Sequence, residues 1–74
     1  MDGRQVTAHF ASFYLGWIGA NPIPNVNLIR TWAHRNKVNR VGTDQWGYAL
    51  YDLTEIVEYA RHRGYLDDAM RDAG

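Results

Sequence analysis

The chain has 74 residues, a length that allows one small domain. It contains no cysteine, which excludes disulfides and thiolate metal sites. Its formal net charge is zero, with 8 basic and 8 acidic side chains, so the overall charge argues against a nucleic-acid partner. The charges are nevertheless segregated: residues 25–43 contain four basic residues and no acid, whereas six acidic and three basic residues follow from Asp52 onward. This pattern indicates either one anion-binding face or a chance scatter of surface charge.

No membrane span or signal peptide is predicted. Residues 5–29 contain no Asp, Glu, Lys or Arg. Asn and Pro residues interrupt this stretch, however, and its continuous apolar part, residues 10–20, is shorter than the roughly 20 residues that a spanning helix needs. No basic segment precedes an apolar run with a small-residue cleavage site. We therefore expect a cytoplasmic protein.

The first predicted helix begins after Thr7, whose hydroxyl can accept from the free amides of the first turn. Phe13 and Trp17 form a second apolar stripe on this helix, beside the expected core stripe. The core stripe consists of residues at helical spacing, Phe10, Ala11, Tyr14, Leu15 and Ile18. Two glycines and an Asn-Pro-Ile-Pro segment end the helix and form a connection over Gly16–Pro24.

A second helix is predicted over about Asn25–Val38, with Asn25 as its N-cap. Asn36 suits a left-handed position near its end. The spacing divides the helix into a buried stripe of Leu28, Ile29, Trp32 and Ala33 and an outward polar face of Asn27, Arg30, Thr31 and His34.

A β-hairpin is expected next, with strands over Asn39–Val41 and Tyr48–Tyr51 and a glycine-hinged tip over residues 42–47. Trp46 in the tip could point toward a DNA minor groove, contact a second protomer or fold back over the hairpin. Folding back is the favoured interpretation. Tyr48 and Tyr51 are expected to be core or helix-stapling residues.

The third helix is predicted from Asp52, which can cap it, with Glu55 at the N3 position of a capping box. Tyr51 and Ile56 stand at the two ends of a hydrophobic staple. Gly64 is expected to end the helix and Tyr65 to pack back on it, after a core stripe of Leu53, Ile56, Val57 and Ala60. The predicted fold is mainly α with a small two-stranded hairpin: one domain over residues 1–65, followed by an acidic flexible tail over residues 66–74.

The order helix, turn, helix, hairpin, helix is that of a winged helix-turn-helix protein, in which the second helix enters the DNA major groove. Three segments, Leu28–Val38, Val41–Gly47 and Leu50–Leu53, resemble the MerR-like DNA-binding domain, in particular the small phage and actinobacterial excisionase-type proteins. The resemblance covers about Val6–Arg63. It rests on an Arg-x-Trp core at Arg30 and a Leu-Tyr-Asp run before the last helix.

The resemblance implies that Arg30 contacts base edges or phosphate, that Trp32 packs the recognition helix on the core, and that Arg35, Lys37 and Arg40 form a basic run toward the wing. Two features depart from the family pattern. The wing lacks the arginine that often precedes its final aromatic residue, so its phosphate contact would pass to Thr43, Gln45 and Trp46. The turn between the first two helices is also longer than usual. The complete predicted DNA-binding set is Asn25, Asn27, Arg30, Thr31, His34, Arg35, Lys37, Arg40, Thr43, Gln45 and Trp46.

No enzyme, cofactor or metal site is predicted. His9, His34 and His62 lack the spacing of a helical metal pair, and Asp67-Asp68 lies in the predicted acidic tail. The sequence also contains no glycine-rich phosphate loop and no nucleophile elbow.

The leading hypothesis is a protein that binds double-stranded DNA with a sequence preference, as an excisionase-like directionality factor or a small transcription regulator at the nucleoid of a bacterial cell. No coiled coil follows the last helix, so we expect head-to-tail self-association on direct repeats, or a recombinase or regulatory partner. Two alternatives stay open: the DNA-binding part of a phage terminase small subunit, which Leu50–Asp52 also resembles, and a protein-interaction module, which the zero net charge and the apolar residues Phe13 and Trp17 allow.

Overall fold

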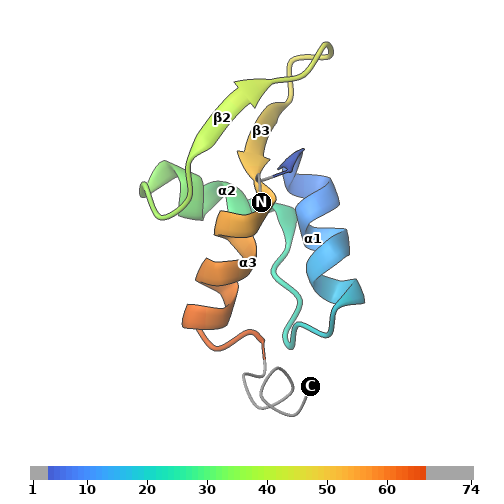
Figure 1. Cartoon of the computed structure of the whole chain (residues 1–74), viewed down its shortest axis with the longest axis vertical. Coiled ribbons are helices and arrows are strands. Elements are labelled where there is room, and N and C mark those ends of the chain that lie inside the picture. Colours follow the sequence, from blue (N-terminus) through green and yellow to red (C-terminus); the bar gives the residue numbers. More distant parts are fainter. Residues whose placement is uncertain (1–3, 67–74) are drawn as a thin grey trace.

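The computed structural model describes residues 4–66. This part of the chain forms three helices and a three-stranded antiparallel sheet, a mixed α/β fold. The elements follow one another as β1 (Gln5–Val6), α1 (Ala8–Trp17), α2 (Val26–His34), β2 (Arg40–Thr43), β3 (Ala49–Asp52) and α3 (Leu53–His62). The helices form the body, and the β2–β3 hairpin projects from one end of it (Figure 1).

All three predicted N-caps are confirmed. Thr7 Oγ1 accepts from the amide of Phe10 at 3.2 Å, and Asn25 Oδ1 accepts from the amide of Leu28 at 2.8 Å. Asp52 Oδ1 accepts from the amide of Thr54 at 2.9 Å. Each cap provides an acceptor for an amide that has no partner inside its helix, which fixes where the helix begins.

Helix α2 ends at His34, four residues before the predicted end at Val38. Asn36 adopts a left-handed conformation with φ 62°, as predicted. Its amide donates to the carbonyl of Ala33 at 3.0 Å, and the amide of Lys37 donates to that of Trp32 at 2.8 Å. This Schellman arrangement closes the helix and turns the chain inward, so Val38 becomes a core residue instead of a helical one.

The sheet has one strand more than predicted. Val6 of β1 pairs with Tyr51 of β3, and the strand order is β1-β3-β2. A two-residue strand is too short to produce a period-two pattern in the sequence, so only the folded chain reveals it. The hairpin strands also start one residue later than predicted, and their register shifts between Arg40 and Gly42, which leaves Val41 exposed.

The hairpin tip is organised by Asp44. Its Oδ1 accepts from the amides of Trp46 at 2.9 Å and Tyr48 at 2.8 Å. Gly47 adopts φ 89°, a conformation that favours glycine, and donates to the carbonyl of Asp44 at 3.1 Å. The expectation that Trp46 folds back is wrong: its side chain is 73% exposed, because the tip extends beyond the body and offers no surface to cover it. Tyr48 is likewise 58% exposed and not a core residue.

Replacing Asp44 with alanine is expected to lower the free energy of unfolding by about 1–2 kcal/mol, because two tip amides lose their acceptor. Asp44→Asn keeps an oxygen acceptor and is the matched control, expected to cost clearly less. Urea unfolding followed by circular dichroism measures both. Equal losses in the two variants would show that the hydrogen bonds of Asp44 do not stabilise the tip.

The core lies where the three helices meet the sheet. Its buried residues come from every element or from its immediate flank: Val6, Ala8, Ala11, Leu15, Ala20, Ile29, Trp32, Val38, Tyr51, Ile56 and Ala60. Both ends of the predicted staple, Tyr51 and Ile56, belong to it. The core stripe predicted for α1 is only partly right. Leu15 and Ala11 are buried, but Phe10 and Ile18 are each 37% exposed, because the small face of the helix turns inward.

The start of α3 differs from the predicted capping box. Glu55 accepts from the backbone amide of Asn39 at 2.8 Å and from its Nδ2 at 3.1 Å. In a capping box Glu55 would accept from the backbone amide of Asp52, but Asp52 belongs to β3 and pairs with Gln5. Glu55 bonds to Asn39 instead and connects the base of the hairpin to α3. The end of α3 follows the prediction, because Gly64 has φ 91° and the amide of Tyr65 donates to the carbonyl of Ala60 at 2.9 Å.

Leu66 packs against the core, so the folded part extends past the predicted domain boundary at residue 65. The rest of the predicted acidic tail, residues 67–74, lies outside the described residues. Within the described part, no helix is long and apolar enough to cross a membrane.

Candidate nucleic-acid interface

Helix α2 presents a polar face to solvent. Its inner side holds Ile29 and Trp32 in the core, while all four predicted outward residues, Asn27, Arg30, Thr31 and His34, are exposed. The sequence spacing therefore assigned this face correctly. Thr31 Oγ1 donates to the carbonyl of Asn27 at 2.9 Å, so part of its hydrogen-bonding capacity is used within the helix. The side-chain oxygen of Asn25 is likewise occupied by capping.

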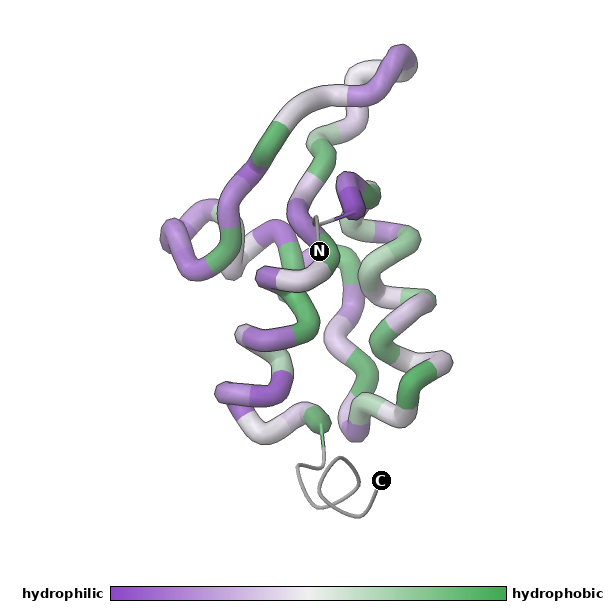
Figure 2. The backbone as a smooth tube through the Cα atoms, in the orientation of Figure 1, coloured by the Kyte–Doolittle hydropathy of each residue, from purple (hydrophilic) through white to green (hydrophobic). Residues whose placement is uncertain are grey.

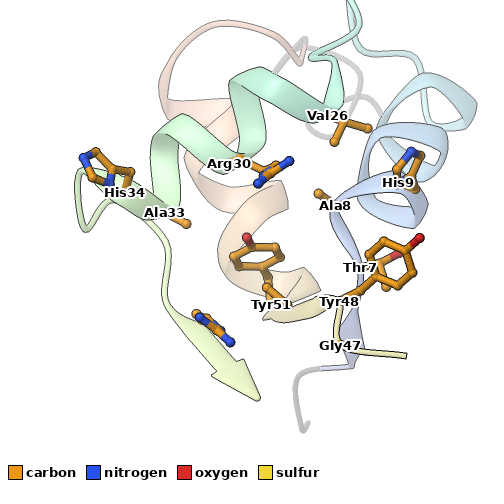
Figure 3. A pocket seen from close by; sticks show the side chains of 12 residues that line it. Thr7, Ala8, His9, Val26, Arg30, Ala33, His34, Gly47, Tyr48 and Tyr51 are labelled. Carbon is orange, nitrogen blue, oxygen red and sulfur yellow. The ribbon is translucent and has the colours of Figure 1, made fainter. Parts of the chain in front are cut away.

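A groove of about 660 Å³ separates α2 from the hairpin and from the start of α1. Figure 3 shows Arg30 extending across its middle, His9 on the side of α1, His34 at the far end of α2 and Tyr51 on the hairpin side. Twelve residues line it: Thr7, Ala8, His9, Val26, Arg30, Ala33, His34, Arg40, Gly47, Tyr48, Ala49 and Tyr51. None of them is acidic.

Arg40 provides the second arginine of the groove, from strand β2. Its Nη2 donates to Thr43 Oγ1 at 2.9 Å, which holds the guanidinium along the hairpin. Thr43, predicted as a direct DNA contact, therefore orients Arg40 in this structure. Arginines from two different elements thus line one concave surface, an arrangement suited to a chain of phosphate groups.

The described carboxylates nearby are engaged in structural bonds. Asp52 caps α3, Glu55 bonds to Asn39, and Asp44 holds the hairpin tip. Glu58 lines a separate hollow of about 270 Å³ between α1 and α3. The groove is basic because its lining holds two arginines and no acidic residue, although the whole chain has a formal net charge of zero.

Apart from Asn25, Asn27, Thr31 and Thr43, described above, the predicted site residues divide into three groups. Arg30, His34 and Arg40 meet around the groove. Arg35 and Lys37 are exposed in the connection after α2. The last group, Gln45 and Trp46, lies exposed at the hairpin tip, away from the groove lining.

Among the groove residues that sequence reasoning missed are His9 and Tyr48. His9 was weighed only as a metal ligand, and Tyr48 was assigned to the core. No local signal identifies them, because the fold alone brings the first turn of α1 and the end of the tip to the groove that α2 lines (Figure 3). Over the residues that the structure describes, no group of three or more His, Cys, Asp or Glu side chains is placed to hold a metal ion.

Comparison of the chain with protein-family models, with curated proteins and with solved structures found no match. The candidate interface is therefore interpreted from its own residues.

Proposed function

We propose that this protein binds double-stranded DNA with a sequence preference, as a winged helix-turn-helix protein. In this arrangement α2 lies in the major groove and the β2–β3 hairpin is the wing beside it. The observation that carries the proposal is the basic groove, which joins the polar face of α2 to the hairpin and has no acidic residue in its lining.

Helix α2 has a suitable size for this role. An α-helix with its side chains is about 10–12 Å in diameter, and the major groove of B-DNA is about 12 Å wide, so the nine residues of α2 can enter it. Asn27 and Arg30 lie on its exposed face, and these are residue types that read adenine and guanine edges through paired hydrogen bonds. We assign Asn27 to base recognition and Arg30, which also lines the groove, to a base edge or a phosphate.

The phosphate backbone is assigned to the groove and to the end of α2. Arg40 and His9 line the groove, while Arg35 and Lys37 lie exposed where the chain leaves the helix. Cations at both positions would contact phosphates on either side of the inserted helix and fix its register. The hairpin tip contributes Gln45 and Trp46 instead of a cation, so its contact with DNA is the weaker part of the interface.

The biological role that we favour is an excisionase-like directionality factor or a small transcription regulator. One inserted helix and one wing cover a single half-site, so useful affinity requires a second copy or a partner protein on the same DNA.

The proposal is tested by selecting bound duplexes from a random pool and titrating the best one by fluorescence anisotropy at several salt concentrations. Four to five phosphate contacts predict a slope of about −4 in log affinity against log salt concentration. Circular dichroism at each salt concentration verifies that the protein stays folded. Failure to enrich any duplex, or an affinity that is equal at about 50 mM and about 200 mM salt, would refute DNA binding.

A further inference from the structure

Helix α1 carries a row of aromatic rings, of which Phe10, Phe13 and Trp17 are exposed and Tyr14 is partly buried beside α3. Phe10, Phe13, Tyr14 and Trp17 recur at helical spacing and form what we call the aromatic face. The ring centroid of Phe10 lies 6.4 Å from that of Phe13 and 6.3 Å from that of Tyr14. The ring centroids of Tyr14 and Trp17 are 6.1 Å apart. Phe13 is 70% exposed and Trp17 is 75% exposed.

Neither the core nor the DNA-binding groove uses this face. The buried side of α1 consists of Ala8, Ala11 and Leu15, on the other side of the helix. Ser12 Oγ donates to the carbonyl of Pro24 at 2.7 Å and attaches α1 to the segment that leads into α2. Among the α1 residues, the groove is lined by Ala8 and His9. The aromatic face is therefore separate from the proposed DNA contacts.

The size of the aromatic face matches that of a protein interface. Aromatic side chains offer about 150–250 Å² each when fully accessible, so the exposed parts of these four amount to roughly 400–500 Å². A standard interface buries about 800 Å² per partner, a little over half of it apolar. One aromatic face against another would thus supply nearly all the apolar area of a dimer.

The charge around this face favours a second copy of the chain as the occupant. Residues 5–29 contain no Asp, Glu, Lys or Arg, and the two charged side chains of α3 near Tyr14, Glu58 and Arg61, are of opposite sign. Two identical faces can therefore meet without net repulsion between like charges. Figure 2 shows the contrast with α3, whose outward segments are hydrophilic, whereas α1 beyond its first turn is hydrophobic or intermediate on all sides.

We propose that two copies of this protein associate through their aromatic faces around a twofold axis, with the two α1 helices antiparallel. In such a pair Trp17 of each copy lies against Phe10 and Phe13 of the other. Both grooves remain accessible. The proposal does not depend on DNA binding, but if both hold, the dimer requires inverted half-sites, whereas head-to-tail stacking requires direct repeats.

Sedimentation velocity of the full chain without DNA, from about 1 µM to about 1 mM, tests the proposal. We expect a reversible monomer–dimer equilibrium. Trp17→Glu is expected to weaken it by about 30-fold or more, because it removes a central aromatic anchor and introduces two like charges into the interface. Phe13→Glu provides a second variant with the same expectation.

The matched control is Trp46→Glu, since Trp46 is 73% exposed but lies at the hairpin tip. It should leave the dimerisation constant unchanged, and circular dichroism should show all three variants folded. A monomer over the whole concentration range, open-ended oligomers, or a dimer that Trp46→Glu weakens as much as Trp17→Glu would each overturn the proposal. A dimer that neither α1 variant weakens would do the same.

Discussion

Replacing Trp32 with alanine is expected to leave most of the protein unfolded at room temperature. Trp32 is only 5% exposed and packs α2 against Tyr59 of α3 and against Tyr65, which follows α3. Its ring lies 4.9 Å from that of Tyr59 in an edge-to-face arrangement and 5.7 Å from that of Tyr65. Removing a buried tryptophan side chain costs about 3–5 kcal/mol, and a core of this size rarely supplies more than about 3–5 kcal/mol in total.

Thermal unfolding followed by circular dichroism measures this effect. Any folded remainder of Trp32→Ala should melt at least about 12 °C below the wild type. Trp46→Ala is the matched control, because it deletes the same side chain from a position that is 73% exposed. That variant should stay within about 0.5 kcal/mol of the wild type. Similar melting temperatures for the two variants would show that Trp32 is not the anchor of α2.

Arg30→Ala is expected to weaken binding of the selected duplex by about 10- to 100-fold. Arg30 extends across the middle of the groove (Figure 3) and has no acidic neighbour in its lining. Its loss therefore removes charge and a forked hydrogen-bond donor from the centre of the proposed contact. Arg30→Lys keeps the charge but not the fork, so an intermediate affinity would indicate paired hydrogen bonds to a base or a phosphate.

The salt dependence of Arg30→Ala distinguishes the two roles. Loss of a phosphate contact should reduce the salt slope by about one and affect all duplexes alike. Loss of a base contact should instead relax the preference at one position of the selected sequence. Arg63→Ala is the control, because Arg63 is an exposed arginine at the end of α3, outside the groove lining. If both alanine variants weaken binding equally, the groove is not the interface.

The two proposals concern two surfaces of this fold, one basic and one uncharged and aromatic. The basic groove combines charge from two different elements, Arg30 in α2 and Arg40 in β2. The aromatic face does the reverse, because a single uncharged helix supplies all of it. A chain with zero net charge can in this way contact an anion on one surface and an identical neighbour on another.

The sequence by itself determined the local features of this protein. The caps at Thr7, Asn25 and Asp52, the left-handed Asn36 and the turn at Gly64 were all predictable. Each depends on hydrogen bonds between residues two to five positions apart, or on the conformational preference of one residue. The inward and outward faces of α2 were also predictable, because helical spacing alone separates its apolar from its polar side chains.

Only the tertiary structure decided which surfaces meet. Strand β1 forms because Val6 pairs with Tyr51 of β3. Glu55 bonds to Asn39, 16 positions away in the chain, instead of capping its own helix. For the same reason α1 turns its small residues inward and leaves Trp17 exposed, although its periodicity allowed a different face. His9 joins the groove only through the packing of α1 beside α2. Such contacts depend on competition between distant partners, which the pattern within one segment does not record.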